Sequence, residues 1–427
     1  MDNKHKIIVM GQQKPLSGPL QIQGSKNAAS KLLGAALLSD NASSIENLPD
    51  IIDIHALKDF LISIGYTLSE KGQKLEISRT SRQGVVIPES FSDNSRSFLL
   101  LLVGLLHSHK KVVFQKPQGC QIGDRSVEGY FATLIAFGVM ATIDKGLYTL
   151  QVESFKPAVI ALDFPSVVSS SMALAAACLA KGESTIVGIS IEPEIISLIE
   201  ALQKMGATII VNDSNAIVKS SGQLMQTTIS VPPDRNVLFT YVIATLLTKG
   251  YTTFTNCNTT HITKDKAFAA FLNVQKIVSR YTKEGLVIDA RKFSPIAMDV
   301  IAYCYPEFQT DWQPLVAPLL LQAKGQSSIE DRIFEDRLRY WKELSKMGTT
   351  SSTVTSENGQ SVHFRAPQIS HGAEVRALDI RAGAAVILLA LISKGATAVT
   401  NIKQIKRGYQ DIVGDLQALG ADISLPH

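Results

Sequence analysis

Apolar and polar positions recur in one order along this chain. A helix of small apolar residues ends at a Lys-Gly or similar stop, a short β-branched strand follows, and after a polar turn an amphipathic helix closes on glycine. The pattern predicts six copies. The apolar helices are expected at 33–38, 99–106, 172–180, 241–247, 315–322 and 384–392, the strands at 43–46, 111–115, 184–187, 252–255, 327–330 and 398–401, and the amphipathic helices at 54–65, 128–138, 194–206, 337–348 and 411–420.

The spacing of the copies indicates a repeated structural unit. Gly182, Gly250, Gly325 and Gly395, which end four of the apolar helices, follow one another at roughly 70 residues. A helix that is apolar all round is typically buried, whereas an amphipathic helix covers a sheet from outside. Six copies in 427 residues predict two domains of three copies each, with a crossover near 232–235. We expect the ligand site in a cleft between the domains.

Composition excludes several functional classes. The net charge of +4 is spread along the chain, which suits small anionic ligands better than nucleic acid. No apolar run reaches the roughly 18 residues of a membrane span, and the start does not resemble a signal peptide, so we expect a cytoplasmic protein with no membrane partner. The four cysteines lie far apart and the eight histidines are scattered, so we expect no metal and no cofactor.

A glycine-rich stretch at 117–125 carries a chemical signal. Cys120 lies between two glycines, and Arg125 follows a few residues later. Glycines allow close backbone approach to a ligand, arginine binds phosphate or carboxylate, and a neighbouring cation favours the reactive thiolate. The stretch is either a mobile loop with a reactive cysteine over an anion site or a surface turn with an incidental cysteine. Spacing alone favours the second interpretation.

Further polar residues stand where the apolar helices begin. Residues 24–27 suit a phosphate at a helix N-terminus, with Lys26 adding charge, or form an ordinary N-cap with a solvated lysine. Arg96 opens the second apolar helix and is either a ligand or a snorkelling side chain. Asp311 opens the fifth, where N-capping and the helix dipole are sufficient alternatives to a chemical role.

Three arginines occupy similar turns of the later copies, namely Arg337, Arg381 and Arg407. Each alone is more typical of a surface ion pair, which contributes little to stability. Together with a lysine and a carboxylate, they indicate the lining of an anion site.

In combination, these motifs resemble those of the enolpyruvyl transferase family. The resemblance covers nearly the whole chain and depends on residues 24–29, 119–125, 192–195, 233–235, 309–311, 334–337, 379–381 and 407–409. No single motif is specific, but the combination is. Asn27 after Lys26 and the Gly-Cys loop are similar to the branch that acts on UDP-N-acetylglucosamine. The 3-phosphoshikimate branch normally has serine after the lysine and lacks the loop.

The resemblance implies an α/β (α+β) fold with two domains, an inside-out α/β barrel in which each domain has three repeated βαβαββ units with buried parallel helices. One domain would be discontinuous, 1–24 plus 234–427, and the inserted domain 25–233 would carry the Cys120 loop. The active site would lie in the cleft and close around its ligands. We expect a monomer or a weak homo-oligomer.

The resemblance also implies the reaction, the first committed step of peptidoglycan synthesis. The enolpyruvyl group of phosphoenolpyruvate would pass to the 3-hydroxyl of UDP-N-acetylglucosamine, with release of phosphate, by addition and then elimination. Lys26 would bind the phosphate, Cys120 would act as general acid, and Asp311 would take the proton of the acceptor hydroxyl. Fosfomycin would alkylate Cys120. The implied substrate-binding residues are Asn27, Arg96, Arg125, Ser166, Val167, Arg337, Asp379, Arg381 and Arg407.

Several positions depart from the family's pattern, mostly on the nucleotide side. A proline, an aspartate and a histidine that usually follow Arg125 are replaced by Ser126, Glu128 and Tyr130. Phe164 stands where a lysine often faces the diphosphate. Further departures are Val168 for glycine, Lys406 for an acidic residue, and 236–240 for the usual Glu-Thr-Gly-Thr.

These departures leave two alternatives open. The first is a paralogue that acts on another acceptor, either a different nucleotide or a shikimate-type phosphate, because 169–171 is similar to the serine pair of that branch. The second is a non-catalytic anion-binding member of the family. Retention of Cys120, Asp311 and Arg407 argues against the second, because a scaffold needs none of them.

Overall fold

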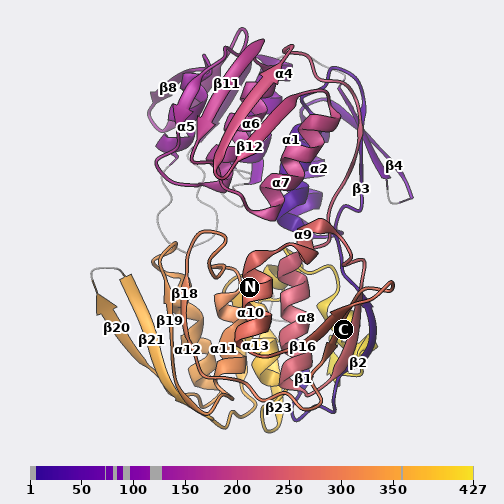
Figure 1. Ribbon diagram of the computed structural model, residues 1–427, viewed down its shortest axis with the longest axis vertical. Coiled ribbons are helices and arrows are strands. Elements are labelled where there is room, and N and C mark those ends of the chain that lie inside the picture. Colours follow the sequence, from indigo (N-terminus) through magenta and orange to yellow (C-terminus); the bar gives the residue numbers. More distant parts are fainter. Residues whose placement is uncertain are drawn as a thin grey trace. The chain divides into compact units, whose positions relative to one another are not determined.

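The computed structural model describes residues 6–72, 74–79, 84–89, 97–115, 127–356 and 359–426. Among these residues the chain forms two compact units (Figure 1). Unit 1 comprises residues 6–23 and 233–426, and unit 2 comprises the described residues of 24–232. Each unit is described separately below.

Within the described residues, each unit contains three four-stranded sheets, and in every sheet one parallel pair is extended by two antiparallel strands. Hydrogen bonding does not join the three described sheets of a unit into one continuous barrel. The unit 2 sheets have the orders β14 (Thr228–Ser230), β3 (Ser43–Glu46), β5 (Lys74–Arg79), β4 (Tyr66–Lys71); β6 (Val85–Val86), β7 (Lys111–Gln115), β9 (Leu147–Gln151), β8 (Met140–Asp144); and β10 (Val159–Ala161), β11 (Gly182–Val187), β13 (Asn215–Ser220), β12 (Thr208–Asn212).

The unit 1 sheets repeat this arrangement and include both terminal segments of the chain. Their orders are β16 (Val278–Tyr281), β17 (Leu286–Asp289), β15 (Tyr251–Thr255), β2 (Ser17–Gln21); β18 (Asp299–Ala302), β19 (Gly325–Asp331), β21 (Gly359–Ala366), β20 (Ser352–Ser356); and β22 (Glu374–Arg376), β23 (Ala396–Thr400), β1 (Ile7–Met10), β24 (Ile423–Ser424). Strands β2 and β14 each complete a sheet whose other strands are distant in sequence, so the chain leaves unit 1 after β2 and returns to it after β14.

Three buried helices pack against one another in each unit, and their side chains are almost wholly inaccessible. They are α1 (Lys26–Ala36), η1 (Ser97–Leu101) continuing into α4 (Leu102–His109), and α6 (Val167–Leu179) in unit 2, and α8 (Arg235–Leu247), α11 (Gln313–Leu320) and α13 (Ile380–Ala390) in unit 1. The remaining helices are α2 (Ile52–Ser63), α5 (Glu128–Ala136), α7 (Pro193–Lys204), α9 (Thr260–Thr263), α10 (Lys266–Val274), η2 (Arg337–Tyr340), α12 (Trp341–Lys346), α14 (Lys403–Lys406) and α15 (Ile412–Ala418).

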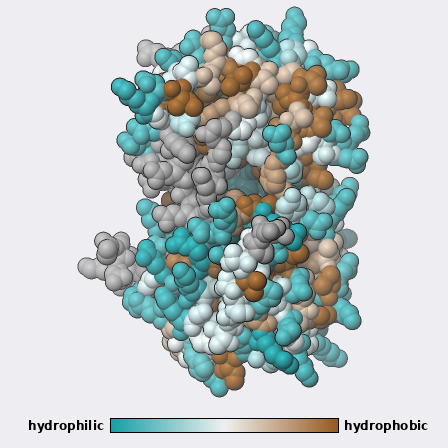
Figure 2. Space-filling model, turned by 90° about the vertical axis from the view of Figure 1, so that its left-hand side faces the viewer, coloured by the Kyte–Doolittle hydropathy of each residue, from teal (hydrophilic) through white to brown (hydrophobic). Residues whose placement is uncertain are grey.

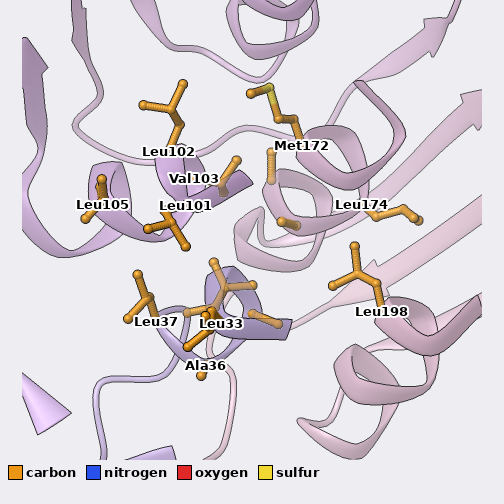
Figure 3. Close-up of a cluster of buried hydrophobic side chains, with 14 of the residues drawn as sticks. Leu33, Ala36, Leu37, Leu101, Leu102, Val103, Leu105, Met172, Leu174 and Leu198 are labelled. Carbon is orange, nitrogen blue, oxygen red and sulfur yellow. The ribbon is translucent and has the colours of Figure 1, made fainter. Parts of the chain in front are cut away.

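Glycines set the distance between two of the buried helices in unit 2. A Cβ atom added to Gly34 of α1 would lie 2.3 Å from the carbonyl oxygen of Leu100, and one added to Gly104 of α4 would lie 2.6 Å from Cβ of Leu37. Figure 3 shows the resulting core, in which Leu33 and Leu37 of α1 face Leu101 of η1 and Leu105 of α4. Close backbone approach therefore accounts for the small residues of these helices.

The predicted α/β fold and its repeated units are confirmed, and the errors are local. Every expected apolar helix and strand overlaps an observed one, but the helices begin earlier, at Lys26 rather than 33 and at Val167 rather than 172. The first turns are polar, which hid them from a search for apolar runs. The expected helix 337–348 is instead η2 followed by α12, and α10, the outer helix of the fourth copy, was not predicted.

The surface is mixed in character. On the face drawn in Figure 2, hydrophobic residues form small groups among hydrophilic ones. Within the described ranges, no helix is both long enough and apolar enough to cross a membrane.

Candidate functional site

The first turns of the three buried helices of unit 1 are joined by side-chain hydrogen bonds. Asn236 lies in the first turn of α8, Asp311 precedes Trp312, the N-cap residue of α11, and Arg381 lies in the first turn of α13. Nδ2 of Asn236 donates to Oδ2 of Asp311 at 3.3 Å, and Nε and Nη2 of Arg381 each lie 3.4 Å from the same oxygen. Because helix N-termini carry partial positive charge, this convergence favours negative groups.

Arg337 and Asp379 complete the cluster. Nη2 of Arg337 donates to Oδ1 of Asp311 at 2.7 Å, and Nη1 lies 3.6 Å from Oδ2 of Asp379. Asp379 is also the N-cap of α13, where its carboxylate accepts the backbone N–H groups of Arg381 and Ala382. The structure therefore brings four of the predicted site residues together within unit 1.

Both arginines of the cluster are buried, with side chains 5% and 3% exposed for Arg337 and Arg381. Burial disfavours their charged form, but nearby carboxylates outweigh it: Asp379, Asp311 and Asp331 raise the pKa of Arg337 above its usual value. Burial likewise opposes the charge of Arg381, and Tyr409 and Asp311 raise its pKa. The interpretation of these arginines as surface ion pairs is therefore wrong.

Each buried arginine has one nitrogen without a hydrogen-bond partner among the described residues. These atoms are Nε of Arg337 and Nη1 of Arg381. Buried donors are nearly always paired in native proteins, so two unpaired donors beside a helix start require an explanation.

The carboxylate of Asp311 is directed at side chains of the cluster. It is 28% exposed, and side chains of Asn236, Arg337 and Arg381 donate to it. The N-cap position of α11 is Trp312, which makes no side-chain capping hydrogen bond. The cluster, rather than a capping role, accounts for the described contacts of Asp311.

Arg407 lies at the end of α14, on the same turn as Tyr409. Its Nη1 donates to Oε1 of Gln404 at 3.1 Å, and its side chain is half-buried. Tyr409 is buried, its hydroxyl lies 2.6 Å from Oγ1 of Thr240, and Cζ of Arg381 lies 5.5 Å from its ring centroid. The turn that carries Arg407 therefore packs against the arginine cluster through Tyr409.

In unit 2, Lys26 opens α1 and is held by a carboxylate. Its Nζ lies 2.7 Å from Oδ2 of Asp53, and the two side chains are 15% and 7% exposed. Ser25 caps α1 by accepting the backbone N–H of Ala28 at 3.3 Å. The interpretation of Lys26 as a solvated lysine is therefore wrong. Asn27 is half-buried.

Ser166 and Val167 stand at the start of α6, and both are half-buried. Oγ of Ser166 caps the helix by accepting the backbone N–H of Ser169 at 3.3 Å. Ser170 donates to the carbonyl oxygen of Ser166 and accepts the backbone N–H of Ser190. The hydroxyl of Ser170 is thus already engaged within unit 2.

Three predicted site residues, Cys120, Arg96 and Arg125, lie outside the described residues, so their roles stay predictions. Two described cysteines, Cys178 and Cys257, are buried, and burial raises the pKa of the Cys257 thiol to about 12. Such thiols are poor nucleophiles. Within the described ranges, no group of three or more His, Cys, Asp or Glu residues could hold a metal ion.

Sequence reasoning missed two residues that contact predicted site residues, and a third that contacts one of these two. Asp53 pairs with Lys26, Asn236 donates to Asp311, and Nε1 of Trp312 donates to Oδ1 of Asn236 at 2.7 Å. Two signals were available in the sequence. Asp53 is an acidic residue in the first turn of an amphipathic helix, and Asn236 is a polar residue near the start of an otherwise apolar helix.

Comparisons with known proteins find relatives over almost the full length of the chain. The model of the EPSP synthase family (3-phosphoshikimate 1-carboxyvinyltransferase) matches residues 10–416. UDP-N-acetylglucosamine 1-carboxyvinyltransferase 3 of Caldanaerobacter subterraneus subsp. tengcongensis is 32% identical over 420 residues, 98% of each chain. UDP-N-acetylglucosamine 1-carboxyvinyltransferase 2 of Listeria monocytogenes serovar 1/2a is 30% identical over 428 residues, 98% of this chain and 97% of the relative.

Two solved structures share the fold. The enolpyruvyl transferase NikO from Streptomyces tendae has a TM-score of 0.87 at 20% identity, with 100% of both chains covered. EPSP synthase from Acinetobacter baumannii has a TM-score of 0.72 at 15% identity, with 99% of this chain and 100% of that chain covered. The predicted resemblance is thereby confirmed: the chain belongs to the EPSP synthase family and is a carboxyvinyl (enolpyruvyl) transferase.

Proposed function

We propose that this enzyme transfers the enolpyruvyl group of phosphoenolpyruvate to the 3-hydroxyl of UDP-N-acetylglucosamine and releases phosphate, as the first committed step of peptidoglycan synthesis in the cytoplasm. One observation carries the proposal: the Asp311 carboxylate is held between two buried arginines, each of which keeps one donor unpaired among the described residues. A base beside an anion-binding pair of guanidinium groups suits this chemistry.

The donor's carboxylate is assigned to the buried arginines. Nε of Arg337 and Nη1 of Arg381 would each donate a hydrogen bond to an oxygen of this planar carboxylate. The phosphate is assigned to Lys26, Arg125 and Arg407. Lys26 is suited to this role because Asp53 fixes its ammonium group beside the first turn of α1.

The proposed reaction has two balanced steps. In the addition, Cys120 delivers a proton to the methylene carbon, the acceptor oxygen bonds to the central carbon, and Asp311 takes the hydroxyl proton. In the elimination, the Cys120 thiolate takes a proton back from the new methyl group, the bond from the central carbon to the phosphate oxygen breaks, phosphate leaves with the electron pair of that bond, and the proton on Asp311 passes to the phosphate or to water. The enolpyruvyl ether remains on the acceptor.

A second candidate is a paralogue with a different acceptor. Phe164 is 44% exposed and stands where the family often has a lysine near the diphosphate. A charge-assisted hydrogen bond contributes roughly 1.5–3 kcal/mol, so its loss would weaken nucleotide binding by one to two orders of magnitude. The relatives named for UDP-N-acetylglucosamine, at 30–32% identity over almost the full length, favour the first candidate.

An acceptor panel tests the proposal. Phosphate release from phosphoenolpyruvate is measured with UDP-N-acetylglucosamine, with UMP and UDP, and with shikimate 3-phosphate, and products are identified by mass spectrometry. We expect turnover with UDP-N-acetylglucosamine. Turnover with another member of the panel alone would establish the paralogue, and binding of phosphoenolpyruvate without turnover would favour the non-catalytic alternative.

A further inference from the structure

Asp311 is contacted from within the core of unit 1 by a neutral side chain. Asn236 is 2% exposed, and its Nδ2 donates to Oδ2 of Asp311 at 3.3 Å. Its Oδ1 accepts Nε1–H of the fully buried Trp312 at 2.7 Å. The three side chains therefore form a chain of hydrogen bonds that ends on the carboxylate.

The chemistry of its neighbours fixes the direction of the Asn236 amide. An indole N–H can only donate, and an ionised carboxylate can only accept. The amide oxygen must therefore face Trp312 and the amide NH2 must face Asp311. The opposite orientation would place two donors together at one end and two acceptors together at the other.

Trp312 is itself held firmly. Its ring stacks on Phe239 with centroids 4.4 Å apart and an angle of 5° between the planes, and Phe308 meets it edge-on at 6.0 Å. Phe239 and Asn236 both belong to α8, within one turn of each other. Helix α8 thus supplies both the side chain that stacks on the indole and the amide that the indole orients.

We propose that Trp312 and Asn236 are positioning residues that orient the Asp311 carboxylate toward the acceptor hydroxyl and stabilise its ionised form. The proposal extends the proposed function, in which Asp311 is the base. Neither residue contacts the reacting atoms in this scheme. Both act through Asp311.

Several charged groups act on the same carboxylate and must stay constant in any test. Arg337 and Arg381 face Asp311 directly. Asp379 and Asp331 also act on the charge of Arg337, and Asp234 acts on that of Arg381, which lies against the Tyr409 ring. Arg235 lies 5.6 Å from the Trp312 ring centroid and pairs with Asp265. Substitutions at Trp312 and Asn236 remove a neutral donor and leave all of these charges in place.

Two variants break the chain of hydrogen bonds at different points. Trp312→Phe keeps an aromatic ring against Phe239 and removes the indole N–H, whereas Asn236→Leu removes the amide at similar volume. We expect each to lower kcat about tenfold, with KM for phosphoenolpyruvate within about twofold, because one hydrogen bond to a charged group is lost. The acidic limb of the pH–rate profile should move to higher pH, because a carboxylate that loses a donor is protonated more easily.

The double variant tests whether the two residues act through one path. If they do, Trp312→Phe in the Asn236→Leu background should have little further effect on kcat. The matched control is Trp341→Phe, because the buried Trp341 lies on α12 and no described hydrogen bond links it to Asn236 or Asp311. This control should leave kcat and the pH profile unchanged.

A spectroscopic readout makes the test independent of the acceptor. The chain has two tryptophans, so the ¹H–¹⁵N spectrum contains two indole signals, which Trp312→Phe and Trp341→Phe assign. Both Asn236→Leu and Asp311→Asn should move the Trp312 signal and leave that of Trp341 in place. A Trp312 signal unchanged by both substitutions would overturn the proposal.

The kinetic outcomes separate this inference from the proposed function. If Asp311→Asn abolishes turnover while Trp312→Phe and Asn236→Leu match the wild type in kcat and pH profile, the positioning role is overturned and the base remains. If Asp311→Asn turns over normally, the role of Asp311 as base fails, and the positioning proposal fails with it. A loss of kcat with an unshifted pH profile in both variants would indicate a structural role and would also overturn it.

Discussion

The two units of this transferase use one scaffold with different polar chemistry at the starts of their buried helices. In unit 1, Asp311, Arg337 and Arg381 are joined in a buried charged cluster. In unit 2, hydroxyl groups of Ser25 and Ser166 cap two buried helices. The described charge at a buried helix start in unit 2 is Lys26, whose ion pair with Asp53 reaches a neighbouring helix.

This difference determines how each unit should respond to substitution. A buried arginine is tolerated only when carboxylates compensate its desolvation, so the members of the unit 1 cluster depend on one another. A serine cap satisfies backbone N–H groups of its own helix, so it acts locally. The repeated fold therefore fixes where the polar residues stand, and the residue types in the first turn decide whether they form a network.

The largest expected effect is on catalysis by the unit 1 cluster. Asp311→Asn should lower kcat by about 10²–10⁴-fold, because the amide cannot take the acceptor's proton. Its oxygen can still accept from Arg337, so circular dichroism should stay close to the wild type, whereas the thermal midpoint should fall because Arg337 and Arg381 lose a counter-charge. Phosphate release under saturating substrates measures the effect.

The matched control for this substitution is Asp289→Asn. Asp289 pairs with the exposed Arg291, so the same chemical change is made away from the helix starts. Equal activities for Asp311→Asn and Asp289→Asn would mean that the cluster at the helix starts of unit 1 has no special role in catalysis.

The next effect is on stability. Arg337→Met should lower the free energy of unfolding by about 3–5 kcal/mol, because Asp311 and Asp379 lose a buried partner. The equivalent test in unit 2 is Ser166→Ala, which should cost about 1 kcal/mol through loss of a cap. Urea unfolding measures both. A cost for Arg337→Met no larger than that for Ser166→Ala would show that the cluster is not mutually dependent.

The fold could be predicted to a large extent because hydrophobic burial leaves a regular trace. The apolar runs that became α8, α11 and α13 mark buried helices directly, and the repeat implied their common environment. The sequence pattern places the helix starts too far along the chain, because polar first turns, such as Lys26 and Asn27 of α1, interrupt the apolar pattern. Those first turns are where the candidate site lies.

Only those residues of the candidate site that belong to recognisable sequence motifs could be predicted. Arg337 and Arg381 were predicted from the turns of the repeat, their roles and that of Asp379 came from the family resemblance, and the structure places all three around Asp311. Trp312 and Asn236 were missed because their partnership depends on two helices meeting in space, and nothing local in the sequence states that pairing. The segment 236–240 was noticed as a departure, but its stacking and hydrogen bonding emerge only from packing.

The smallest expected effect concerns a carboxylate of unit 1 that lies outside the cluster. Asp415 of α15 accepts a hydrogen bond from the hydroxyl of the buried Tyr241 at 2.5 Å. Burial raises its pKa to about 6, Tyr241 opposes the shift and the charge of Asp411 adds to it. In the described part of the chain, no cation is among the groups that shift the pKa of Asp415. Asp415 therefore shows how burial destabilises an ionised carboxylate that lacks arginine partners such as those of Asp311.

This raised pKa fixes the sign of a pH effect on stability. Between the unfolded value near 4 and the folded value near 6, the folded chain binds the extra proton, so the stability contributed by Asp415 is present below about pH 4 and is lost as the pH rises through 6. Asp415→Asn stays neutral and keeps an oxygen for Tyr241. The variant should therefore unfold like the wild type at pH 4 and be more stable by about 1–2 kcal/mol at pH 8. Urea titrations at both values measure the difference, and a difference that does not change with pH would mean that Asp415 ionises in the folded protein as freely as in the unfolded chain.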